Sequence, residues 1–311
     1  MIITEKLNKR FCKDNNLSIN VYKEPYFTSR LKLYGCYDDY QDFVKMIEEK
    51  FSGNEESYFA YYNEVKDKII DYIKNSATYK YLQTADMSAL NYRGTTITSD
   101  YPDREVYKEN LIGKSFISID MCKANYTALV AYGMQTELPF VPDEIGFNYY
   151  KFIKQFTDNT HIINSKYIRQ VVFGNCNPKR QIHFEKCMML NLLERLIHSK
   201  SINKEDIYSV RADEIIIDGF NPGLIHMLIT TEFPVSFEYF KLGRIYGTSG
   251  YIKNIANNEI KIKCASSDEL PFIYRLLKGE EVQPEDLIFT YNGQLAQLLK
   301  APELKIVGGV Q

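Results

Sequence analysis

Two segments of the sequence each place acidic side chains at the end of an apolar run. The run KSFISID ends at Asp120, and Asp213 and Glu214 directly precede three isoleucines. Single acids at such positions are common in turns. If the two strands paired, however, these carboxylates would meet at one sheet edge and could hold a pair of Mg²⁺ or Mn²⁺ ions for phosphoryl transfer. We therefore take Asp120 and Asp213 as candidate catalytic residues, and Asp120, Asp213 and Glu214 as candidate metal ligands.

A third segment, KYIRQVVFG at residues 166–174, combines cations with an aromatic side chain. On a helix, Lys166, Arg169 and Gln170 share one face, because residues three and four positions apart are neighbours. Two cations on one face can bind a triphosphate, and Phe173 followed by a glycine leaves room for a base to stack. An amphipathic helix with solvated lysine and arginine is the alternative.

The charge is small overall but unevenly distributed. The 38 Lys and Arg residues against 40 Asp and Glu give a net charge of −2, which argues against a nonspecific nucleic-acid-binding protein. Residues 36–60 carry seven acids against two lysines, whereas residues 165–204 carry eight Lys or Arg against two glutamates. A basic zone on a nearly neutral chain suits an anionic ligand bound in one place. A solvated helix face is the alternative.

The elements that would position these residues follow from hydrophobic periodicity. A strand over 114–120 and a hairpin of 208–210 and 214–217, with its bend at 211–213, would present the carboxylates. A long helix over 179–199 leads into the hairpin, and this order of elements is that of an α+β sheet domain. The other expected elements are two short strands within 17–36, helices over 39–51 and 58–73, an irregular stretch over 76–110, a helix or tight turn over 126–133, helices over 147–156 and 161–173, strands over 235–240, 251–255 and 259–264, and helical pieces over 269–277 and 295–299.

Length and composition limit the class of protein. The 311 residues allow one large domain or two modest ones. The six cysteines are scattered without a Cys-x-x-Cys pair, so we expect reduced thiols and neither a zinc site nor a redox motif. The sequence has no apolar run as long as a membrane span and no signal peptide, which predicts a soluble, cytoplasmic protein. Its richness in Lys, Asn, Ile and Tyr indicates an AT-rich coding sequence, as in a phage or virus whose proteins act in the host cell.

In order and spacing, the three segments resemble the palm and fingers of template-directed nucleic-acid polymerases, most closely those of family B DNA polymerases. The first palm motif of that family, Asp-x-x-Ser-Leu-Tyr-Pro-Ser, is similar to 120–127. The fingers motif, Lys-x-x-x-Asn-Ser-x-Tyr-Gly, is similar to 166–174, with Gln170 where Asn is usual, and the second palm motif, Tyr-Gly-Asp-Thr-Asp-Ser, is similar to 210–214. The resemblance covers about residues 110–250, and 212–214 also look like the Ala-Asp-Asp motif of reverse transcriptases and the Asp-Glu motif of family A polymerases.

The resemblance implies a role for each matching residue. Asp120 and Asp213 would hold two metal ions. Asn125 takes the place of the tyrosine that excludes a 2′-hydroxyl, with Tyr126 as its alternative, and Arg211 replaces the first aspartate of the second palm motif. The residues that would contact the nucleotide substrate are Lys166, Arg169, Gln170, Phe173, Asn125 and Tyr126, and those that would contact nucleic acid are Lys179, Arg180, Lys241 and Arg244.

The implied fold is α+β, with a polymerase-like palm sheet over 111–235, a helical fingers insertion at about 134–175, an N-terminal α+β region over 1–110 and a small C-terminal α/β thumb-like region over 236–311. The first 110 residues are too short for the family's usual N-terminal region plus a proofreading exonuclease.

We therefore predict a nucleotidyltransferase: a minimal or split family B-like DNA polymerase catalytic subunit that acts in DNA replication. Its partners would be a primer–template, nucleoside triphosphates and another polymerase subunit, with no membrane. The alternative is a catalytically altered, palm-derived protein that binds nucleic acid or serves a structural role, because Arg211 could neutralise the metal site.

Overall fold

The strand β1 (Ser115–Met121) pairs along both of its edges and lies inside an antiparallel sheet. In this computed structural model, which describes residues 3–97, 101–176, 178–219, 224, 231–255 and 259–308, the strand order is β2-β3-β1-β4-β5-β6, and β9 pairs with β4. The bounds of these strands are Ile207–Val210 for β2, Glu214–Asp218 for β3, Val235–Tyr246 for β4, Tyr251–Ile255 for β5, Glu259–Lys263 for β6 and Lys305–Val307 for β9.

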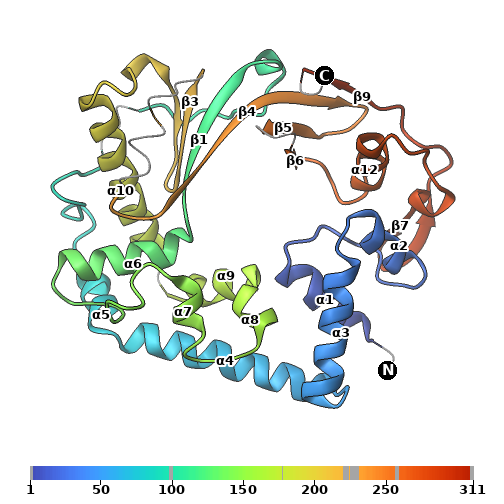
Figure 1. Cartoon of the computed structure of the whole chain (residues 1–311), viewed down its shortest axis with the longest axis horizontal. Helices are drawn as coiled ribbons and strands as arrows, with labels where there is room; N and C mark the ends of the chain where they lie inside the picture. Colours follow the sequence, from blue (N-terminus) through green and yellow to red (C-terminus); the bar gives the residue numbers. More distant parts are fainter. Residues whose placement is uncertain are drawn as a thin grey trace.

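Helices from the first half of the chain lie opposite the sheet, and α10 runs beside it (Figure 1). The helix α6 packs against α10, and α10 packs against the strand β3. One face of the sheet at β3 is therefore covered by α10. The α-helices are α1 (Glu5–Asp14), α2 (Tyr26–Leu33), α3 (Tyr37–Phe51), α4 (Glu55–Asn75), α5 (Ala77–Thr84), α6 (Ala124–Gln135), α7 (Tyr149–Ile153), α8 (Thr160–Asn164), α9 (Lys166–Gly174), α10 (Pro178–His198) and α12 (Leu270–Lys278), and the 3-10 helices are η1 (Glu109–Leu111), η2 (Lys204–Asp206) and η3 (Pro284–Leu287).

The two faces of β1 have different neighbours. Ile117, Ile119 and Met121 join the large core that also contains buried residues of α6 and α10. Phe116 belongs to a smaller apolar cluster on the other face. Because side chains alternate along a strand, Asp120 lies on the same face as Phe116 and away from the large core. The strand thus holds its carboxylate on the face that does not pack against α10.

The two ends of the chain are joined by a buried ion pair. Arg30 of α2 donates to the carboxylate of Asp286 in η3 over 2.8 Å, and both side chains are almost fully buried. Arg275 of α12 donates to the same carboxylate, also over 2.8 Å. The Tyr34 and Tyr274 rings stack nearby, with centroids 4.5 Å apart. The N-terminal helices therefore pack against the C-terminal region, as Figure 1 shows on its right side.

The mixed α+β class predicted from the sequence is confirmed. The strand expected over 114–120, the hairpin around 211–213 and the long helix over 179–199 correspond to β1, the β2–β3 pair and α10. The helices expected over 39–51 and 58–73, the helix over 269–277 and the strands after 235 are also present as α3, α4, α12, β4, β5 and β6, and the segment 126–133 lies within the helix α6.

The two strands expected within 17–36 are wrong. Residues Tyr26–Leu33 form the helix α2, and Phe27, Arg30 and Leu31 are buried at helical spacing. Ile19 and Val21 are buried in alternation, as in a strand, but they pair with no other strand among the described residues. Alternation alone cannot make a strand, because a strand needs a partner for its backbone groups. With these strands absent, the described residues before Ser115 contain helices and one isolated bridge between Tyr92 and Thr95.

Four other expectations need correction. The helix expected over 295–299 is the strand β8 (Gln294–Gln297), which pairs with β7 (Ile288–Tyr291). The helix expected over 161–173 is two helices, because the Ser165 hydroxyl caps a new helix by accepting from the Ile168 amide. The stretch over 76–110 contains the helix α5, which the Ser76 hydroxyl caps, and the helix over 147–156 shortens to α7.

Candidate active site

The sheet brings Asp120 and Asp213 to neighbouring positions. In the antiparallel β1–β3 pair, Asp120 lies opposite Glu214, and the Met121 amide donates to the Asp213 carbonyl over 2.8 Å. The turn that carries Asp213 is closed by the Arg211 amide, which donates to the Glu214 carbonyl over 2.8 Å. Both aspartate side chains are open to solvent. The juxtaposition expected from the sequence is therefore present in the backbone.

Asp120 is surrounded by other negative charges. Its pKa is raised to about 6, first by desolvation and then by the charges of Asp213 and Glu214. Desolvation also raises the pKa of Asp213. Asp120 is exposed to solvent, so this desolvation comes from the protein around the site rather than from enclosure of the side chain. A divalent cation at this position would relieve the repulsion between these carboxylates.

A third carboxyl lies behind Asp213. Glu185 of α10 is 3% exposed, and it accepts a hydrogen bond of 2.7 Å from the Asn125 amide. Burial raises its pKa to about 7, and the charge of Asp213 adds to the shift. The sequence analysis did not identify Glu185. The available signal was its spacing, because Gln181, Glu185 and Met189 recur every four residues on the buried face of α10.

Glu214 interacts with a hydroxyl and a lysine on the sheet face that also carries Phe116 and Asp120. The Ser118 hydroxyl donates to its carboxylate over 2.6 Å. The buried Lys253 ammonium lies 3.8 Å from both Glu214 and Glu238. Lys261 pairs with Glu238 as well. Because Glu214 is already occupied by a hydroxyl and a lysine, Asp120 and Asp213 are the carboxylates best placed to bind a metal ion.

Cations from three segments act on one another electrostatically near Asp120. The pKa of Lys166 in α9 is lowered by burial and by repulsion from Arg169, Lys263 and Lys123, whereas the charge of Asp120 raises it. These interactions place Lys263 of β6 and Lys123 of the turn after β1 within electrostatic reach of Lys166. In Figure 1, α9 lies on the side of the molecule toward which β1 ends. Sequence analysis identified Lys166 and Arg169 but missed Lys123 and Lys263.

Two expected substrate contacts are wrong. Phe173 is 1% exposed and Tyr126 is fully buried. The Tyr126 hydroxyl donates to the Gly146 carbonyl over 2.7 Å, so it faces the interior. Phe173 shares the apolar face of α9 with Ile168 and Val172 and packs into the core. Neither ring can stack on a base without unpacking that core. Asn125 stays partly exposed beside Glu185, and Gln170 is exposed on α9.

The expected nucleic-acid contacts are spread over several places. Lys179 and Lys241 are exposed. Lys241 lies opposite Ser115, at the end of β1 that is remote from Asp120. Arg180 donates from its guanidinium to the Ala85 carbonyl over 3.2 Å. Arg244 donates to the Gly250 carbonyl over 2.5 Å, and its guanidinium lies over the Tyr251 ring, so it is bound within the β4–β5 hairpin.

Arg211 forms ion pairs with residues that precede β1. Its guanidinium lies 3.3 Å from Asp103 and 3.1 Å from Glu105. It lowers the pKa of Asp213 only as a minor influence, after desolvation, a backbone hydrogen bond and Glu214. The neutralisation of Asp213 by Arg211, on which the alternative interpretation depends, is therefore weak.

The donor set can be tested against a Mg²⁺ site. Within the described ranges, no group of three or more His, Cys, Asp or Glu side chains is arranged around a common point. Mg²⁺ is often held by only one or two carboxylates, with water and substrate phosphates as its other ligands. Asp120 and Asp213 supply that number of carboxylates, on neighbouring strands of the sheet.

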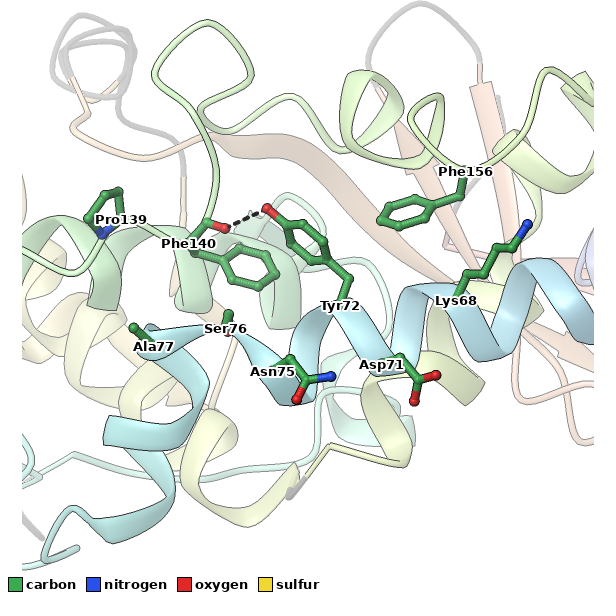
Figure 2. Close-up of a pocket in the computed structure, with 9 residues that line it drawn as sticks. All are labelled: Lys68, Asp71, Tyr72, Asn75, Ser76, Ala77, Pro139, Phe140 and Phe156. Atoms are coloured by element: carbon green, nitrogen blue, oxygen red, sulfur yellow. Dashed lines mark hydrogen bonds between the residues drawn. The ribbon is translucent and has the colours of Figure 1, made fainter.

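A hollow elsewhere on the molecule is lined differently. It lies along α4 and the segment after α6, encloses about 640 Å³ and is floored by the rings of Tyr72, Phe140 and Phe156 (Figure 2). The Tyr72 hydroxyl donates to the Phe140 carbonyl over 3.1 Å. Its polar rim is formed by Lys68, Asp71 and Asn75 of α4. Its lining comes from helices and loops rather than from the sheet, so it is separate from the aspartate pair.

Comparisons with models of protein families, with curated proteins and with solved structures found no match. The resemblance to polymerases therefore rests on the three sequence motifs alone. Each helix in the part of the chain that the structure describes is too short or too polar to cross a membrane.

Proposed function

We propose that this chain is a nucleotidyltransferase, a minimal or split DNA polymerase subunit of the family B kind. In this proposal β1 and the β2–β3 hairpin form the palm, the helices α7, α8 and α9 are the fingers, and the region from β4 onward, whose first strand pairs with β1, is thumb-like. The observation that carries the proposal is the exposed aspartate pair at the ends of β1 and β3, opposite the cations around Lys166. Carboxylates that can hold Mg²⁺, facing cations that can bind phosphates, are the parts that phosphoryl transfer requires.

In this proposal the acidic residues bind the metal ion and the basic residues bind the phosphates. Asp120 and Asp213 would hold Mg²⁺ or Mn²⁺, which when bound lowers the pKa of an attacking hydroxyl and stabilises charge on the phosphate. Lys166, with Arg169, Lys123 and Lys263 around it, would bind the triphosphate and offset the charge of the departing pyrophosphate. The primer 3′-oxygen forms a bond to the α-phosphorus as the bond to the bridging oxygen breaks, and pyrophosphate leaves.

A second candidate is a palm-derived binding or structural protein. It is favoured by the engagement of Glu214 with Ser118 and Lys253, which leaves only two aspartates for the metal. Such a protein would bind nucleic acid or a protein partner equally well with and without Mg²⁺. Calorimetric titration with Mg²⁺ separates the candidates, because the enzyme requires ion uptake that Asp213→Asn abolishes.

The decisive assay is primer extension with Mg²⁺ or Mn²⁺, in which deoxy- and ribonucleotides are offered on DNA and on RNA templates. We expect incorporation by the unmodified chain and its loss in Asp120→Asn. The matched control is Asp218→Asn, because Asp218 is an exposed aspartate at the other end of β3. Failure of the unmodified chain on every template, or retained activity in Asp120→Asn, would refute the proposal.

A further inference from the structure

The helix α1 has one cationic face. Lys6, Lys9, Arg10 and Lys13 are spaced three or four positions apart, so they project from the same side of the helix. Figure 1 shows α1 beside α9, and the two helices pack against each other. The cationic face of α1 therefore lies next to the helix that carries Lys166.

Asp14 fixes the junction between these helices. Its buried carboxylate accepts a hydrogen bond of 2.7 Å from the Ser165 hydroxyl and one of 2.9 Å from the Tyr62 hydroxyl. Lys13 directly precedes Asp14, and Lys166 directly follows Ser165. This buried hydrogen bond joins the end of α1 that carries Lys13 to the start of α9, which carries Lys166.

An aromatic ring lies at the same junction. Tyr167 is partly exposed, with the Arg10 guanidinium 4.3 Å from its ring centroid and the Lys13 ammonium 5.7 Å from it. The Arg10 guanidinium also lies 4.8 Å from the Tyr62 ring. A cation within about 6 Å of a ring centroid is attracted to the face of the ring, so both cations favour this place beside Tyr167.

The lysines at the two ends of the cationic face of α1 differ in whether an acidic side chain pairs with them. Lys6 pairs with Glu55 over 3.2 Å, and Lys9 pairs with Glu5 over 2.6 Å. Lys13 is exposed and forms no salt bridge with any acid in the described part of the chain. The uncompensated positive charge of Lys13 therefore lies at the end of α1 that adjoins α9, near the Tyr167 ring.

We propose that Lys13 and Tyr167 form a binding site for single-stranded nucleic acid at the junction of α1 and α9, next to the helix that carries Lys166. The inference rests on the proposed function and adds the path of the unpaired strand. A free cation beside a partly exposed ring suits one strand, since a phosphate can meet Lys13 and an unpaired base can stack on the open part of the Tyr167 ring. A duplex offers no unpaired base to the ring.

The test measures the binding of a labelled single-stranded 12-nucleotide probe, as DNA and as RNA, by fluorescence anisotropy in EDTA. We expect Lys13→Gln to weaken binding by about threefold to tenfold. The slope of the logarithm of affinity against the logarithm of salt concentration should fall by about one, which corresponds to the loss of one phosphate contact. Lys13→Arg should bind as the unmodified chain does. The matched control is Lys68→Gln, because Lys68 is an exposed lysine on α4 paired with Glu64.

Equal affinity of Lys13→Gln and Lys68→Gln would overturn the inference, and so would tighter binding of a blunt duplex than of the single strand. Tyr167→Leu should weaken binding while Tyr167→Phe preserves it, which separates ring stacking from loss of a hydroxyl. These measurements need no Mg²⁺ and no turnover. Strand binding without primer extension would refute the proposed function alone, and extension without a Lys13 effect would refute the strand site alone.

Discussion

Acids and cations meet at two places in this molecule, and the two places differ in how completely the charges are satisfied. At the junction of the chain ends, the Asp286 carboxylate accepts hydrogen bonds of 2.8 Å from Arg30, from Arg275 and from the Gln283 amide. At the end of β1, desolvation and then the like charges of Asp213 and Glu214 raise the pKa of Asp120 to about 6. A satisfied carboxylate serves the fold, whereas a cluster of repelling acids open to solvent is a candidate functional site.

The largest expected effect concerns the carboxylates at the end of β1, the candidate functional site. Asp120→Asn and Asp213→Asn should each reduce primer extension by on the order of 10³-fold or more, because each removes a charge that holds the metal. The melting temperature should stay the same or rise, because the substitution also removes repulsion. Parallel extension assays and thermal melts check both results. A loss of activity that merely follows a loss of folded protein would contradict the assignment.

The next effect tests the structural half. Asp286→Ala should lower the free energy of unfolding by about 3–5 kcal/mol, because it leaves the buried Arg30 guanidinium without its partner. Urea denaturation measures the change. Glu49→Ala, which removes an exposed partner of Lys45 on α3, is the control and should change stability little. A small effect of Asp286→Ala would mean that the junction is not a structural pair.

The functional half was the easier one to predict from the sequence. Asp120 and Asp213 end or begin apolar strands, so their places at the sheet edge followed once the strands paired. Lys123 and Lys263 reach Lys166 from other segments, and no local pattern links them to it. Their grouping depends on tertiary packing, which spacing along the chain does not show.

Two local sequence signals, one for the β7–β8 hairpin and one for the helix α2, point to the observed elements but are weaker than competing patterns. The β7–β8 turn contains Asn292 and Gly293, both with positive φ, which is the preferred pair for a tight hairpin. The apolar residues near 295–299 were nevertheless interpreted as a helix. In α2 the helical spacing of Phe27, Arg30 and Leu31 was obscured because Arg30 is a buried cation whose partner, Asp286, lies far along the chain. A long-range ion pair cannot be inferred from local periodicity.

A moderate, pH-dependent effect should appear at Glu185, which is buried like Asp286 but accepts, within the described ranges, a hydrogen bond from the Asn125 amide alone. Because its folded pKa of about 7 lies above the ordinary value, the native state loses stability as the pH rises from about 4.5 to 7. Glu185→Gln removes that charge, so it should be more stable than the unmodified chain by about 1–3 kcal/mol at pH 8 and nearly equal at pH 4.5. Urea unfolding in EDTA at both pH values measures this, and a pH-independent difference would contradict it.

The smallest effect is expected at Arg211, and it decides whether the acids at the end of β1 are truly uncompensated. Arg211 forms ion pairs with Asp103 and Glu105. These two acids offset most of its positive charge, so its effect on Asp213 is small. Arg211→Gln should therefore change the apparent Mg²⁺ affinity and the extension rate by less than about threefold, as expected for a partly exposed ion pair. Calorimetric titration and primer extension measure the two quantities. A gain of tenfold or more in Mg²⁺ affinity would show that Arg211 neutralises the site, and it would make the end of β1 resemble the satisfied junction at Asp286.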